Sequence, residues 1–107
     1  MDMYDTVIED KALKDVGLEL MFLTPEKCSN EDGITAVELS KQLSLPLDTV
    51  KKKLKLLHAK GIVQVKGINP KLWKFNEYNF QRMPEDDDVY MLLCSFDDVD
   101  FDKYFSY

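Results

Sequence analysis

The sequence has little material for cysteine-based or metal-based architecture. Of its 107 residues only Cys28 and Cys94 are cysteines, and they lie far apart without CxxC spacing. This excludes a disulfide framework or a cysteine-built zinc site, and we expect two reduced, structural thiols. The single histidine, His58, has no cysteine or carboxylate at metal-binding spacing. We interpret it as structural, and we expect no metal ion and no cofactor.

Catalytic signatures are also missing. The sequence shows no Ser, His and Asp arrangement, no glycine-rich phosphate loop and no paired carboxylate motif, and one histidine leaves little for acid–base chemistry near pH 7. Asp98, Asp100 and Asp102 imitate the first ligands of a calcium loop, but Lys103 stands where that loop needs glycine. We therefore expect neither calcium binding nor an enzyme.

Long apolar stretches are absent too. The longest apolar run, residues 89–94, is far shorter than the roughly 18–20 residues of a membrane helix. The first residues are acidic and do not form a secretory signal. Four glycines and four prolines are too few for a linker-rich chain. These features predict a compact cytoplasmic protein of one small domain, with no membrane contact.

The charged residues are distributed unevenly. Fourteen Lys and Arg face twenty Asp and Glu, and the resulting net charge of −6 argues by itself against a nucleic-acid-binding protein. Residues 51–76, however, contain eight lysines and no acid, between two acidic flanks. A solvated face usually mixes both signs. This segment therefore predicts an electrostatic contact surface, with a lysine-rich helix that merely aids solubility as the alternative.

The apolar spacing predicts a first helix over about residues 9–23, where apolar side chains recur at intervals of three and four. Pro25 ends it. The turn-forming composition of residues 24–33 predicts a loop. The first third of the chain is therefore one amphipathic helix followed by a connection.

Two further helices follow in close succession. Thr35 and Glu38 fit a capping box, in which the threonine hydroxyl accepts the amide of the third residue on. Pro46 ends this helix and leaves only a tight turn before the next, which runs over residues 47–59. Gly61 is well placed to end that helix in the left-handed conformation.

A small hairpin completes the pattern. Residues 62–66 and 72–75 are apolar-rich segments that predict strands, and residues 67–70 have turn chemistry between them. Trp73 lies in the second strand. We interpret it as packed on the neighbouring helix, with a base-stacking platform as the less favoured alternative.

Segment 34–76 combines a short helix, a tight turn, a second helix and a hairpin. Ten residues carry this pattern: Thr35, Glu38, Leu39, Leu43, Thr49, Val50, Leu54, Leu57, Gly61 and Val63. This pattern resembles the winged helix-turn-helix superfamily of transcription regulators. With the first helix, the resemblance covers about two thirds of the chain. It implies a mainly α fold with a small β-wing, in which a three-helix core carries a β-hairpin. It also implies that residues 47–59 form a recognition helix in the DNA major groove, with the wing touching the DNA backbone or the minor groove.

The charged side of that helix lies opposite its apolar stripe. A helical wheel places Asp48, Thr49, Lys52, Lys55, Leu56 and Ala59 away from the core. Lysines at the edges of this side and on the hairpin are suited to phosphate contacts. We expect eight residues to bind double-stranded DNA: Thr49, Lys51, Lys52, Lys53, Lys55, Lys66, Lys71 and Lys74.

Two features modify this interpretation. The hairpin has no arginine, so sequence discrimination is expected to be modest unless dimerisation adds to it. Leu56 is expected to be exposed on the helix, where it could meet a thymine methyl group, mark a protein interface, or have no special role.

An additional C-terminal element follows. Pro84 and the acids of residues 85–88 suit a helix start, although the apolar run after them also fits a buried strand. Because residues 1–80 suffice for the winged-helix domain, we expect residues 81–107 to serve dimerisation or docking. The residues expected to contact a second copy or a partner are Val89, Leu92, Leu93 and Phe96.

Acids and aromatics alternate in residues 97–107, which predicts either a tail that docks on a protein partner or a frayed end. The favoured function is a homodimeric, DNA-binding transcription regulator. The alternative is a winged-helix protein–protein interaction module in a larger assembly, with the acidic, aromatic tail as its docking segment.

Overall fold

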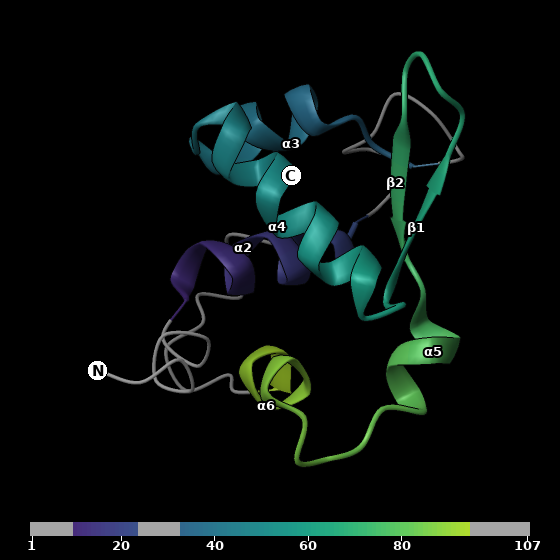
Figure 1. Cartoon of the computed structure of the whole chain (residues 1–107). Coiled ribbons are helices and arrows are strands. Elements are labelled where there is room, and N and C mark those ends of the chain that lie inside the picture. The colour runs from purple at the N-terminus through teal and green to yellow at the C-terminus, as the bar shows by residue number, and fades with distance from the viewer. Residues whose placement is uncertain (1–9, 24–32, 95–107) are drawn as a thin grey trace.

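The computed structural model describes residues 10–23 and 33–94. Within them the chain is mainly helical and carries one small antiparallel hairpin, as the sequence predicts (Figure 1). The elements are, in order, α2 (Lys11–Met21), α3 (Ala36–Leu43), α4 (Leu47–Ala59), β1 (Val63–Lys66), β2 (Leu72–Phe75), α5 (Glu77–Gln81) and α6 (Asp88–Cys94). No helix in these two segments has the length and apolarity needed to cross a membrane.

Helix α2 begins at Lys11, slightly later than the spacing predicts, because Asp10 caps it. The Asp10 Oδ1 atom accepts a hydrogen bond from the Leu13 amide at 2.9 Å. Leu13 and Val16 are fully buried, and with Leu18 and Leu20 they line the centre of the core. This helix is therefore the element on which the others pack.

Helices α3 and α4 begin and end close to the predicted residues. The Thr35 hydroxyl accepts from the Glu38 amide at 3.1 Å, so the predicted threonine cap forms, and it donates to the Glu38 carboxylate at 3.2 Å. Ser44 ends α3 with φ 56° and ψ 42°, a conformation uncommon outside glycine. Gly61, with φ 81°, follows α4 in the predicted left-handed conformation. Two tight ends thus set the direction of α4.

The hairpin pairs β1 with β2 in a register that places Val65 opposite Trp73. A single residue, Ile34, also pairs with Trp73 through hydrogen bonds of 3.0 and 2.8 Å. Gly33 allows this approach, because a Cβ atom there would lie 2.4 Å from the Trp73 carbonyl oxygen. The sequence pattern does not predict this bridge, since one residue produces no alternation.

Helix α5 is a second element that the sequence pattern does not predict. Asn76 caps it by accepting from the Asn79 amide at 3.1 Å, and the Asn79 side chain donates to the Gly61 carbonyl at 2.8 Å. Phe80 lies between Phe75 and a third ring, that of Tyr90, with ring centroids 5.2 and 5.0 Å away. The helix therefore joins the base of the hairpin to α6.

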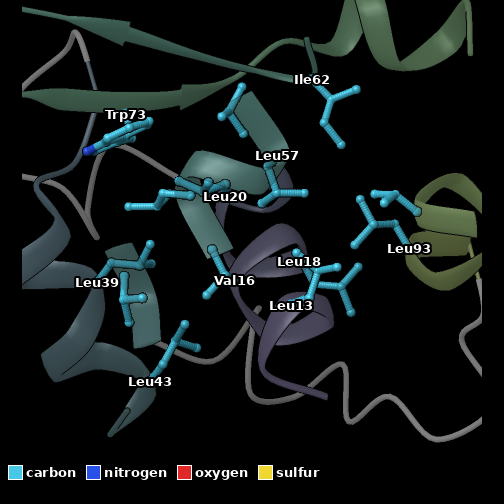
Figure 2. Packing of buried hydrophobic residues seen from close by; sticks show 14 of the residues in the cluster. Leu13, Val16, Leu18, Leu20, Leu39, Leu43, Leu57, Ile62, Trp73 and Leu93 are labelled. Atoms are coloured by element: carbon cyan, nitrogen blue, oxygen red, sulfur yellow. The ribbon is translucent and has the colours of Figure 1, made fainter. Parts of the chain in front are cut away.

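The segment after Pro84 is a helix, as expected, but it begins at Asp88 and its apolar side faces inward. Val89, Leu92 and Leu93 are buried in the same core as α2, and Figure 2 shows Leu93 facing that cluster. The core therefore extends past the boundary expected between residues 80 and 81.

This burial corrects the contact assignment for α6. Because these three side chains pack within the protomer, they offer no apolar face to a second copy, and they no longer argue for a homodimer. The fourth residue of the expected contact, Phe96, lies outside the described residues. Cys94 is exposed, which corrects the expectation of a packed thiol there, and Cys28 also lies outside the described residues.

Candidate nucleic-acid interface

Helix α4 has one buried side and one exposed side, as the helical wheel predicts. Val50, Leu54 and Leu57 are fully buried against α2 and α3. The exposed side, called here the outer face, consists of Asp48, Lys51, Lys52, Lys55, Leu56, His58 and Ala59. In Figure 1 this helix crosses α2, with α3 beside its first half and the hairpin beyond its last turn. The outer face is therefore uncovered by the described elements.

Lys53 does not belong to the outer face. Its Nζ atom donates to Asp10 Oδ2 at 2.6 Å, and its side chain is only 22% exposed. The Lys53 charge is therefore directed at the N-terminus of α2, and its expected phosphate contact stays a prediction. Thr49, also expected to touch DNA, is half-buried on the same edge of the helix.

Lys60, just past the end of α4, is also paired with an aspartate that precedes a helix. Its Nζ atom donates to Asp87 Oδ2 at 2.9 Å. The other carboxylate oxygen of Asp87 accepts from the amides of Val89 and Tyr90 at 2.9 and 3.3 Å, so Asp87 caps α6. Partial burial raises the pKa of Asp87, but the hydrogen bonds from Lys60 and the two amides outweigh it and lower the pKa below its ordinary value.

The structure thus divides the lysine-rich segment into two groups. Lys53 and Lys60 each hold the carboxylate that caps a neighbouring helix. The second group consists of other exposed lysines, Lys51, Lys52 and Lys55 on α4, and Lys66, Lys71 and Lys74 on the hairpin. Sequence alone signals the first group only weakly, through the positions of Asp10 and Asp87 ahead of apolar helices.

On the hairpin, Trp73 and Lys74 point to opposite sides. Trp73 is 9% exposed and meets the ring of His58 edge-on at 6.2 Å, which confirms its packed role. Lys74 and its cross-strand partner Gln64 are exposed on the other side. The hairpin therefore adds lysines to the surface without exposing its tryptophan.

The described residues are less acidic than the whole chain. They contain twelve of the fourteen Lys and Arg but only ten of the twenty Asp and Glu. The negative net charge that argues against nucleic-acid binding therefore comes from residues outside the described part. Across residues 10–23 and 33–94, no three His, Cys, Asp or Glu side chains gather into a metal-binding cluster.

This geometry offers exposed ammonium groups on a helix and a neighbouring hairpin. Ammonium groups bind phosphate oxygens as point charges, without the paired geometry of arginine. No protein-family model, curated protein or solved structure matches the chain.

Proposed function

We propose that the protein is a double-stranded DNA-binding transcription regulator of the winged-helix type. In this proposal α4 is the recognition helix and the hairpin is the wing. The observation that carries it is the set of six exposed lysines on these two elements, in a segment of 26 residues without an acid. Such a concentration of positive charge is suited to a phosphate backbone.

The arrangement of elements supports this proposal. Helix α4 contacts α2, α3 and β1, and the bridge from Ile34 to Trp73 ties the segment before α3 to the hairpin. A recognition helix needs such support, because phosphate contacts fix the register of a protein on DNA only if the helix is held rigidly.

Binding is expected to depend mainly on charge. Lysines contact phosphates without reporting the base sequence, and no arginine lies between residues 33 and 81 to pair with guanine. Asp48, exposed at the start of α4, repels phosphates and can accept a hydrogen bond from a cytosine amino group. We therefore expect strong salt dependence with modest sequence preference.

The test is a salt titration of duplex binding, followed by fluorescence anisotropy. The double variant Lys52→Ala/Lys55→Ala should bind about tenfold more weakly at 0.1 M salt and lower the slope of log K against log salt by about two units. The matched control is Lys11→Ala/Arg82→Ala, which removes the same charge from exposed side chains on α2 and after α5. An equal loss in both variants would show that only net charge matters and would contradict a role for α4.

One observation favours the alternative, a protein–protein interaction module. Leu56, within the outer face, is 38% exposed and sits among the lysines. An apolar side chain surrounded by charge is also the pattern of a protein contact. If the wild type shows no salt-dependent duplex binding, the outer face of α4 is better explained as a surface for an acidic protein partner.

A further inference from the structure

The tip of the hairpin exposes an isolated aliphatic side chain. Ile68 is 88% exposed, the highest value among the large apolar side chains that the structure describes. It lies in the connection between β1 and β2, which extends away from the helices in Figure 1. Water contact with such a side chain is unfavourable, so Ile68 contributes nothing to the stability of the isolated fold.

The backbone around Ile68 forms a tight, narrow tip. Gly67 adopts φ 82°, and a Cβ atom there would lie 2.8 Å from the Pro70 carbonyl oxygen. Only glycine therefore fits where the chain turns toward Pro70. This close return presents Ile68 at the end of a thin projection instead of on a broad surface.

Positive charge flanks the tip on both strands. Lys66 is the last residue of β1 and Lys71 immediately precedes β2, and both are exposed. An apolar side chain between two ammonium groups is complementary to a groove with phosphates along both walls, where the side chain can reach the apolar faces of two bases once it parts the step between them. A protein surface of mixed charge would not require this symmetry.

We propose that Ile68 inserts from the hairpin tip into the DNA minor groove, between two base pairs, and kinks the duplex. This rests on the proposed function of α4 and the hairpin as a DNA-binding surface. The minor groove is about 6 Å wide, whereas two paired strands already lie about 4.8 Å apart before their side chains are counted. Only the tip of this hairpin therefore enters the groove, and Ile68 is the side chain there that can part a base step.

The wedge also supplies a source of sequence preference that the lysines lack. Pyrimidine–purine steps such as TA and CA unstack at the lowest cost. A protein that parts one base step binds best where such a step lies at the correct distance from the helix in the major groove. The preferred sites are thus chosen by deformability as well as by base contacts.

The test uses the full chain and a duplex with 2-aminopurine beside a central TA step and a fluorophore at each end. The wild type should raise the 2-aminopurine emission, because the base unstacks, and shorten the distance between the ends. Ile68→Ala should abolish both signals and weaken binding by about tenfold. Ile68→Leu, which keeps a bulky aliphatic group, should retain them. The matched control is Met91→Ala, since Met91 is an exposed apolar residue on α6.

The outcomes separate the wedge from the proposed function. If Ile68→Ala leaves bending, emission and affinity at wild-type values while Lys52→Ala/Lys55→Ala weakens binding, the wedge is wrong and α4 remains a DNA-binding helix. If no form of the protein binds duplex, both proposals fail. If Ile68→Lys binds more tightly than Ile68→Ala but leaves the duplex straight, the kink depends on the apolar group, as proposed.

Discussion

Helices α4 and α6 use their two sides in different ways. Helix α4 buries its leucines and leaves lysines on an uncovered outer face, whereas α6 buries its apolar side on α2 and uses the acid before it, Asp87, as a cap. The contrast shows that an apolar stripe on a helix must be buried, but that the same chain can bury it without a second copy or a partner. Charged side chains without a partner, by comparison, stay at the surface whatever the apolar side of the helix packs against, because burying them is costly.

The largest expected effect tests whether α6 belongs to the core. Leu93 is fully buried, so Leu93→Ala should lower the free energy of unfolding by about 2–5 kcal/mol, measured by urea denaturation. A loss below about 1 kcal/mol, together with a shift from dimer to monomer in sedimentation, would restore the interpretation of α6 as a contact between copies.

A second variant tests the contact between α2 and α6 from the other side. A Cβ atom at Gly17 would lie 2.4 Å from Leu93 Cδ2. Gly17→Ala should gain about 1 kcal/mol from helix propensity but lose about 1–3 kcal/mol to overpacking, a net destabilisation. In the Leu93→Ala background the obstruction is gone, and the same change should become stabilising. A double-mutant cycle measures this reversal, and equal effects in both backgrounds would contradict it.

A third comparison is made within α4, between neighbouring lysines. Lys53→Met removes the partner of Asp10 and should lower the free energy of unfolding by about 1 kcal/mol. Lys52→Met is the control on the outer face and should change it by less than about 0.5 kcal/mol. Duplex binding should respond in the opposite order, with Lys52→Met weakening it more than Lys53→Met. Equal thermal shifts for the two variants would show that the pair with Asp10 contributes nothing.

The smallest expected effect concerns pH. Because the pKa of Asp87 is lowered in the folded protein, its contribution is complete above the ordinary carboxylate pKa of about 3.9 and is lost as the pH falls through the lowered value. Asp87→Asn keeps a capping side chain but not the charge. At pH 7 the wild type should be more stable by less than about 1 kcal/mol, and this advantage should vanish in acid. An advantage independent of pH would exclude a role for the Asp87 charge.

Most of the helices and strands can be predicted from the sequence, because the spacing of apolar residues and the capping residues are local properties. The Thr35 cap, the buried stripe of α4 and the left-handed Gly61 all occur where the pattern predicts them. Five-residue α5 is too short to show a period, and its only local signal is the capping residue Asn76. A helix of five residues is therefore missed.

For the candidate site, the sequence locates the lysines but not their partners. Lys53 and Lys52 are adjacent and chemically identical, yet only Lys53 meets a carboxylate, 43 residues away in the chain. Likewise, the exposure of Ile68 depends on the hairpin extending from the body. Such distinctions depend on tertiary packing, which one-dimensional periodicity does not contain.

The two lysine–aspartate pairs have a consequence for how α4 is oriented about its own axis. Lys53 and Lys60 lie seven residues apart, about two turns or 10.5 Å along a helix, and they hold the starts of two different helices. Leucine packing alone tolerates small rotations of a helix, since one apolar contact can replace another. Directional charge pairs at two levels resist such rotation. The rotational register of α4 is thereby set from its inner edge, and with it the angle at which every lysine of the outer face leaves the molecule.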